Sequence, residues 1–140
     1  MSDLNSYYAL VEECLKEIGI QDPDKVKWMP GMWHFSLGSA KITIAVKEDL
    51  RIKTNTFTVV SPVTVMPKEK RLEFYEELLR LNYKMGDVAL ASMGGFVCVF
   101  AGRELEGLDK SEVLRTFQRV ATSADYLDDY LQNKYNLPQV

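Results

Sequence analysis

The side chains that most often perform catalysis are scarce in this chain. Among its 140 residues there is one histidine, His34, and there are two cysteines, Cys14 and Cys98. A Ser-His or Cys-His site, or a histidine-based zinc site, would therefore need His34. No Cys-x-x-Cys or His-x-x-x-His spacing occurs, and the cysteines are typical of small buried apolar residues. We expect no catalytic residue, no metal and no cofactor.

Acidic residues occur in adjacent pairs, which are typical of solvated helix surfaces. The pairs are Glu12–Glu13, Glu76–Glu77 and Asp128–Asp129. Neighbouring residues of a helix point about 100° apart, so the two members of a pair do not share one site. Asp125 and Asp129 are four residues apart, but no acidic loop surrounds them to hold a hard cation. We therefore expect these carboxylates to face water.

The sequence holds neither a phosphate-binding glycine motif nor a basic stretch. Gly94–Gly95 falls between two strand-like segments instead of before a helix, which indicates a hairpin turn. The densest basic region, from Lys41 to Lys53, is interrupted by Glu48 and Asp49. The net charge is −3, and an acidic surface repels phosphates. We expect no nucleic-acid binding.

Large apolar side chains cluster around a turn near residue 30. Trp28, Met29, Met32 and Trp33 flank the dipeptide Pro30–Gly31. Tryptophan and methionine are frequent in surfaces that accept peptides, so these four residues are candidates for binding a partner protein. The same residues are also typical of the first strand of a core, and the sequence leaves both interpretations open.

The spacing of apolar residues predicts helices and strands in the order α-β-β-β-α-β-β-α. Apolar residues recur every three or four positions in the expected helices and alternate with polar residues in the expected strands. The helices are expected at residues 4–18, 67–81 and 109–131, and the strands at 33–37, 42–46, 56–65, 87–93 and 96–103. Short turns favour an antiparallel sheet, so we expect an α+β sandwich with three helices packed on its apolar face.

Five residues mark expected helix boundaries or an irregular strand. Gly19 is expected to end the first helix in a left-handed conformation, and Pro67 to occupy the first turn of the second helix. Asp109 and Glu112 have the spacing of a capping box at the start of the last helix. Pro62 cannot donate to a strand ladder, so its strand is expected to lie at an edge or to be bulged there.

The second expected helix has a wider apolar arc than contact with one sheet requires. Its apolar residues cover about half of a helical wheel: Leu72, Phe74, Tyr75, Leu78, Leu79 and Leu81. Covering a sheet takes a stripe of about 100°, so the excess predicts a subunit interface, most often a two-fold dimer. The residues assigned to this interface are Phe74, Tyr75, Leu78 and Leu81. A groove between the sheet and a neighbouring helix would explain the same arc.

Length and composition limit the class of protein. A chain of 140 residues that is 46% apolar and 26% charged is typical of one globular domain, here residues 1–140. Residues 1–6 lack the basic start and apolar run of a signal peptide. No apolar stretch reaches the ~18 residues of a membrane span. We expect a cytoplasmic protein that does not contact a membrane.

Several motifs resemble a known family. They are Leu78-Leu79-Arg80-Leu81-Asn82, the hairpin Val88-Ala89-Leu90 with Phe96-Val97-Cys98-Val99, and Glu104-Leu105-Glu106-Gly107-Leu108-Asp109 followed by Val113, Leu114, Phe117 and Ala124-Asp125. With the order of elements, they resemble the type III secretion chaperone fold. Within this fold, the chain is most similar to the YbjN-like bacterial proteins, described as sensory transduction regulators.

The resemblance implies a homodimer built partly on the middle helix, without catalysis. In chaperones of this fold, an extended client segment crosses apolar patches on the sheet and the first helix. The leading hypothesis is therefore a dimeric, non-catalytic module, chaperone-like or regulatory, that binds an extended segment of a partner protein. The alternative is a small-ligand or signalling domain with a pocket on the sheet face. An enzyme based on His34 is the third hypothesis.

Overall fold

The computed structural model describes residues 4–140 of the chain. Its elements are α1 (Leu4–Glu17), the short 3₁₀ helix η1 (Pro23–Lys25), β1 (Lys27–Met29), β2 (Met32–Leu37), β3 (Ala40–Asp49), β4 (Thr54–Val65), α2 (Arg71–Met85), β5 (Ala89–Met93), β6 (Phe96–Glu104) and α3 (Lys110–Tyr135). The expected order of helices and strands is confirmed with one addition. The short strand β1 precedes the first strand that the sequence predicted.

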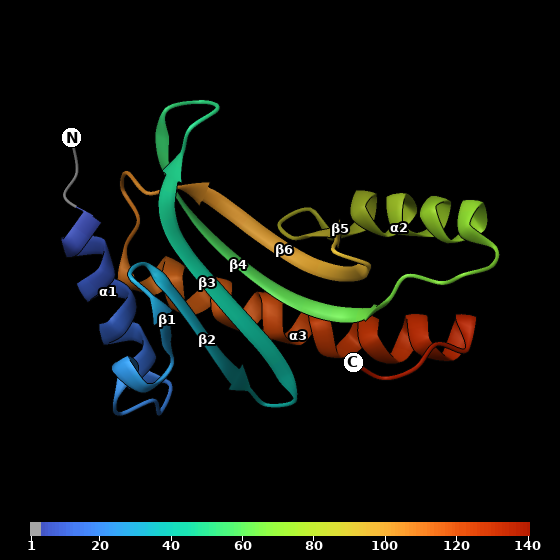
Figure 1. Cartoon of the computed structure of the whole chain (residues 1–140), viewed down its shortest axis with the longest axis horizontal. Coiled ribbons are helices and arrows are strands. Elements are labelled where there is room, and N and C mark those ends of the chain that lie inside the picture. Colours follow the sequence, from blue (N-terminus) through green and yellow to red (C-terminus); the bar gives the residue numbers. More distant parts are fainter. Residues whose placement is uncertain (1–3) are drawn as a thin grey trace.

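The described strands form one antiparallel sheet in the order β1-β2-β3-β4-β6-β5. Strands β1 to β4 pair with one another in sequence. β6 then pairs with β4, and β5 is added on the far side of β6. Figure 1 shows β3, β4 and β6 as long, curved strands in the middle of this sheet. The antiparallel α+β architecture predicted from the sequence is therefore confirmed.

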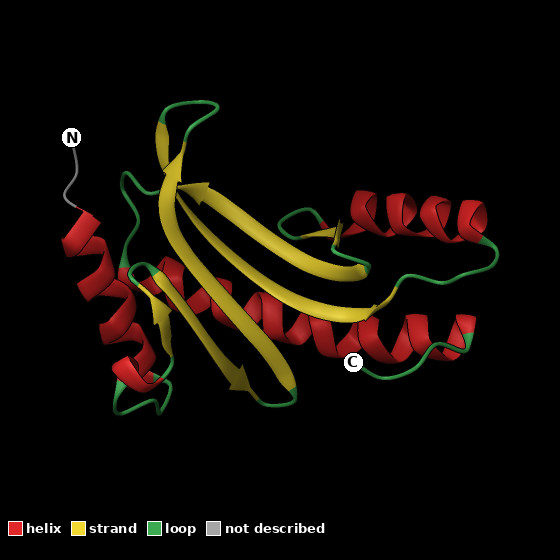
Figure 2. Cartoon of the chain, viewed as in Figure 1, coloured by secondary structure: helices red, strands yellow, loops and turns green. Residues whose placement is uncertain are grey.

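Two helices cover one face of the sheet, which we call the inner face. α3 packs across β3, β4 and β6, and α1 packs against α3 and β3. Ile42, Ile44 and Val46 of β3 point to this face and are buried. In Figures 1 and 2, α3 passes behind the strands, whereas no helix of the described residues crosses in front of β2, β3 and β4. The opposite face, which we call the outer face, is therefore open.

The third long helix, α2, lies at an edge of the sheet instead of on the inner face. It runs beside β5 (Figure 1), where the side-chain amide of Asn82 donates to the carbonyl of Leu90 (3.3 Å) and accepts from its N–H (2.7 Å). This pair of bonds satisfies backbone groups that would otherwise be free to pair with another strand. From this edge α2 still packs on the sheet, because Phe74 and Leu78 belong to the common core. The expected packing of helices on the apolar face is therefore confirmed, with α2 at its margin.

Helix boundaries agree with the local signals in α1 and α3 but not in α2. Gly19 has a φ of +103° just after α1, and the Asp109 carboxylate accepts from the N–H of Glu112 (2.9 Å) at the start of α3. The second helix begins at Arg71 instead of residue 67 and ends at Met85 instead of residue 81. The Arg71 guanidinium donates to the Pro67 carbonyl (2.9 Å), so Pro67 belongs to a linker that folds back on the helix start.

The strand that contains Pro62 is bulged but is not an edge strand. The pairing of β4 with β6 shifts register between Pro62 and Thr64, because proline has no N–H to donate to the ladder. β4 lies between β3 and β6, so the edge interpretation is wrong. The edges of the described sheet are β1 and β5.

Candidate functional site

The hairpin of β1 and β2 divides the four candidate partner-binding residues between core and surface. Trp28 is 73% exposed and Met29 is 50% exposed, whereas Trp33 is fully buried. The Trp33 ring lies edge-on to Tyr8 of α1, with the ring centroids 5.9 Å apart, and Met32 is half-buried. The core interpretation therefore fits Trp33, while Trp28 and Met29 form an exposed apolar pair at the β1 edge.

The turn between β1 and β2 is held tightly against the rest of the molecule. Gly31 has a φ of +82°, and a Cβ at this position would lie 2.5 Å from the Val46 carbonyl oxygen and 3.1 Å from the Tyr8 ring. The N–H of Val46 donates to the Gly31 carbonyl (2.8 Å). Only glycine fits this close approach, so the turn that follows Trp28 and Met29 is fixed against β3 and α1.

A depression of 510 Å³ lies beside Trp28. It is lined by Lys25, Val26, Lys27, Trp28, His34 and Thr43. His34 is exposed, and its Nδ1 lies 2.9 Å from the Thr43 hydroxyl. Both residues alternate with buried neighbours on β2 and β3, which places them on the outer face. The depression therefore combines an aromatic wall with polar and cationic groups.

The predicted dimer residues of α2 lie on two different sides of the helix. Phe74 is fully buried and Leu78 is 9% exposed, and the Phe74 ring packs edge-on against Tyr135 at 5.0 Å. Leu81 is half-buried, and Tyr75 is 39% exposed. Phe74 and Leu78 thus contribute to the core of their own chain, and Tyr75 is the most accessible of the four to a second copy.

A second row of apolar side chains follows the exposed side of α2. We call Leu72, Tyr75, Leu79 and Tyr83 the α2 stripe; all four are exposed, and their spacing of three or four residues places them on one side of the helix. Asn82 faces β5, and Glu77 faces α3. On a helical wheel the stripe lies next to Asn82 and opposite Glu77. The stripe is therefore on the same side of α2 as the outer face of the sheet.

The outer face next to the α2 stripe is also apolar. Phe96 and Phe100 of β6 alternate with the buried Val97 and Val99, so they point to the outer face, where both remain partly exposed together with Met93. The ring of Phe100 occupies the space beside Gly102 that a Cβ would fill. The solvated face of an antiparallel sheet is usually polar, so these exposed aromatic residues mark a candidate interface.

A buried carboxylate connects α2 to α3. The Glu77 side chain is 4% exposed, and it accepts hydrogen bonds from the Tyr130 hydroxyl, from Lys134 (3.1 Å) and from Arg80. The bond from Tyr130 is the main cause that holds the pKa of Glu77 below its usual range, with Lys134 and Arg80 adding to it. The expectation that the Glu76–Glu77 pair is solvated is wrong for Glu77.

The position of Glu77 on the helical wheel was the signal that could have revealed its burial. Glu77 lies about 40° from Leu81 and about 60° from Phe74 on the wheel. Both of these residues turn toward the core. A carboxylate this close to the inward side of a helix needs a partner, and Tyr130 and Lys134 of α3 supply it.

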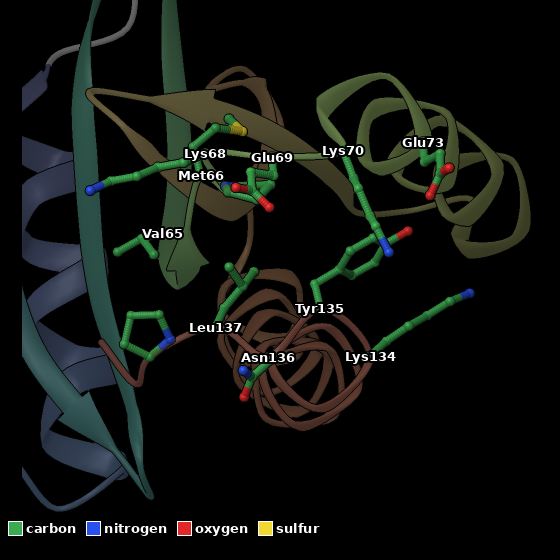
Figure 3. Close-up of a pocket in the computed structure, with 12 residues that line it drawn as sticks. Val65, Met66, Lys68, Glu69, Lys70, Glu73, Lys134, Tyr135, Asn136 and Leu137 are labelled. Carbon is green, nitrogen blue, oxygen red and sulfur yellow. The ribbon is translucent and has the colours of Figure 1, made fainter.

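A larger cavity of 890 Å³ lies between the linker before α2 and the end of α3 (Figure 3). Its lining includes Lys68, Glu69, Lys70, Glu73 and Lys134. Figure 3 shows Lys68 and Lys134 extending in opposite directions, so their ammonium groups do not converge on one point. A small-ligand site requires convergent polar groups in an apolar pocket, and this cavity also lies away from the outer face. It does not favour the small-ligand alternative.

The thiols, the possible metal ligands and the helices of the described residues bear on the remaining kinds of site. Both cysteines are free and buried; burial raises the pKa of Cys14 to about 11 and also raises that of Cys98, so both thiols stay protonated and unreactive at neutral pH. Within residues 4–140, no group of three or more His, Cys, Asp or Glu side chains is placed to hold a metal ion. In the same range, no helix has the length and apolar character to cross a membrane.

Comparison with known proteins concerns the fold. No protein-family model and no curated protein matches the chain. A chain of the ExsC–ExsE complex superimposes with a TM-score of 0.69 at 13% identity, covering 92% of this chain and 96% of that chain. A chain of the HopA1–SchA chaperone–effector complex superimposes with a TM-score of 0.66 at 10% identity. The match covers 92% of this chain and 99% of that chain.

A third structure extends the comparison. It contains the Yersinia pestis type III secretion chaperone SycH with a fragment of YscM2, and one of its chains gives a TM-score of 0.61 at 12% identity, covering 86% of this chain and 98% of that chain. At these identities the likeness concerns the fold alone, and membership of the YbjN-like group stays a prediction. The chain described here has the α+β fold of the type III secretion chaperones.

Proposed function

We propose that this protein is a non-catalytic, homodimeric module that binds an extended segment of another protein, as a chaperone or as a regulator. One observation carries the proposal: exposed apolar side chains gather on two surfaces that no described element covers. The first surface is the β1 edge with the outer face of β2 and β3, and the second is the α2 stripe with the adjoining outer face of β5 and β6. The fold shared with a chain of a chaperone–effector complex supports a protein as the partner.

The β1 edge and the outer face suit an extended segment. β1 ends the described sheet, so a partner strand can pair with it through main-chain hydrogen bonds, as in other complexes that add a strand to a sheet. Trp28 and Met29 are exposed at this edge, and large, accessible aromatic residues commonly provide much of the binding energy of an interface. The strand of Pro62 lies inside the sheet, so β1 is the edge on this side that is open to a partner strand.

The α2 stripe suits a second copy of the chain. A two-fold dimer brings the same patch of both copies together, so an apolar stripe on one protomer meets an apolar stripe on the other. The exposed Met93, Phe96 and Phe100 lie on the same side and enlarge the surface available for contact. A stable interface needs more than about 1,000 Å² in total, which one helix stripe with an adjoining sheet face can supply.

The cellular setting is part of the same proposal. We take the protein to be a cytoplasmic bacterial protein that forms one domain over residues 1–140. The resemblance to YbjN-like proteins supports a regulatory role, and the structural neighbours support a chaperone role. Membranes and nucleic acids are not proposed as partners.

Capture of the partner by Trp28 variants tests the binding site. The full chain serves as bait in extracts of its source cell, with bound proteins identified by mass spectrometry. Trp28→Ala should lower the affinity for the captured partner by about thirtyfold, because truncating a central aromatic residue of an interface costs about 2 kcal/mol. Tyr126→Ala is the matched control, since Tyr126 is an equally exposed aromatic residue on α3. Unchanged capture by Trp28→Ala would place the site elsewhere.

A further inference from the structure

Resting on the proposed function, we infer that the segment bound on the outer face is acidic, with Asp or Glu alternating with apolar residues. Lysines that form no ion pair are spread along the outer face, from the depression beside Trp28 to both ends of β3. Lys25 lines the depression, while Lys41 and Lys47 alternate with buried residues of β3 and so point to the same face as Thr43. All three lysines are exposed, and none forms an ion pair within residues 4–140.

One carboxylate of the outer face, Glu104, lies in the same cross-strand row as Lys47 and forms no ion pair within the described residues; the other carboxylates around this face are paired or lie to one side. Asp49 pairs with Arg51 (2.9 Å), and the Lys27 ammonium, which also borders the depression, is shared by Glu12 and Asp24. Lys41 borders a small pocket with Asp125 and Asp128 beyond the end of the face, without an ion pair to either. The unpaired charges of the outer face are then Lys25, Lys41 and Lys47 against the single carboxylate of Glu104, so the face as a whole keeps an excess of positive charge.

This local excess opposes the net charge of the chain, which is −3. Complementary charge guides a partner to a surface and fixes its register, and the excess here is cationic, so carboxylates complement it. The apolar component comes from Trp28 and Val26, which line the depression together with Lys25. An extended chain points alternate side chains to one side, so a segment of alternating acidic and apolar residues meets both features.

Single-stranded nucleic acid is the other polyanion that combines flat rings with negative charge. The overall charge of −3 repels its backbone at a distance. Among the described residues, three unpaired lysines lie on this face, whereas backbone-tracking grooves contact many phosphates. An acidic protein segment therefore fits the outer face better.

Two synthetic peptides test this inference on the full chain. Both are fluorescein-labelled, about twelve residues long and identical at their apolar positions; the remaining positions are Glu in one and Lys in the other. Fluorescence anisotropy should give about tenfold tighter binding of the acidic peptide at low salt, the effect expected of three exposed ion pairs. The preference should shrink as salt is added.

Charge reversal of the lysines provides the matched comparison. Lys25→Glu, Lys41→Glu and Lys47→Glu combined should reverse the preference, so that the basic peptide binds more tightly. Lys84→Glu changes the same charge at an exposed position of α2 and should leave the preference as it is. Circular dichroism of each variant checks that the fold is retained.

The outcomes separate this inference from the proposed function. Equal affinity for both peptides, lost in Trp28→Ala, would overturn the acidic preference and leave the docking site in place. Failure of both peptides to bind, or binding that ignores Trp28→Ala, would overturn the docking site and the acidic preference together. Tighter binding of an oligo-dT strand than of the acidic peptide would assign the outer face to nucleic acid and reject the inference.

Discussion

The inner and outer faces of the sheet are formed by the same strands and differ in what covers them. On β3, the residues that face inward are Ile42, Ile44 and Val46, and α1 and α3 bury them. The outer face has the exposed Lys41 and Lys47, as expected where a sheet meets water. On β6, however, the outer face also carries aromatic residues. The outer face of β6 is therefore suited to contact with another protein surface.

The same contrast separates the two sides of α2. Phe74 and Leu78 are buried against the chain's own core, and Glu77 is bonded to α3 beside them. Leu72 and Leu79 are equally apolar yet face solvent. Apolar character alone therefore does not identify the core; the direction of each side chain relative to β5 and α3 does.

The two tryptophans give the largest expected effect. Trp33→Ala should lower the free energy of unfolding by about 3–5 kcal/mol, because it removes a fully buried ring and leaves a cavity. Trp28→Ala should change it by no more than about 0.5 kcal/mol, since an exposed side chain contributes little to folding. Chemical denaturation followed by circular dichroism measures both. If both variants lost a similar amount of unfolding free energy, Trp28 would belong to the core as Trp33 does, and the distinction between buried and exposed tryptophan would be wrong.

Charges placed in the α2 stripe give the next largest effect. The double variant Leu72→Glu, Leu79→Glu should raise the dissociation constant of the dimer by at least about a hundredfold, because each copy would bury two unpaired carboxylates in the interface. Light scattering at about 50 μM should then report a monomer that is still folded, since both positions are exposed.

The choice of residues matters for this test. Leu78 lies in the protomer's own core, so charging it would unfold the chain as well as separate the copies. Lys84→Glu serves as the control on the same helix. A native protein that is monomeric at about 50 μM, or a double variant that remains dimeric, would contradict the dimer through the α2 stripe.

Removing the buried charge of α2 gives the smallest of these effects. Glu77→Gln should lower the free energy of unfolding by about 1–2 kcal/mol at neutral pH, the cost of weakened hydrogen bonds to a charged group. The pKa of Glu77 is lowered from its ordinary value of 4.5 by folding. Its contribution is therefore complete above about pH 5 and is lost as the pH falls through the lowered pKa.

The effect of Glu77→Gln on the free energy of unfolding should depend on pH. Native protein and Glu77→Gln should differ most at neutral pH and converge in acid. Glu76→Gln, which changes the neighbouring exposed carboxylate, should follow the native curve throughout. If the free energies of unfolding of native protein and Glu77→Gln differ by the same amount from neutral to acidic pH, the charge of Glu77 is not what stabilises the fold.

Local patterns in the sequence determined the elements and the fold class of this protein. Alternation placed Trp33 and Phe35 on the same side of β2, and both are buried. Gly19 and Asp109 end and begin helices through contacts within a few residues. Such features depend on near neighbours in the chain, so periodicity and capping chemistry are sufficient to predict them.

Only the tertiary structure decided which surfaces are covered. The interior position of β4 depends on its pairing with β6, which lies across α2 in the sequence, and the burial of Glu77 depends on Tyr130 and Lys134 of α3. The exposure of Trp28 depends on which strand ends the sheet. These contacts join residues far apart in the chain, and no local pattern encodes them because hydrophobic burial responds to whatever packs nearby.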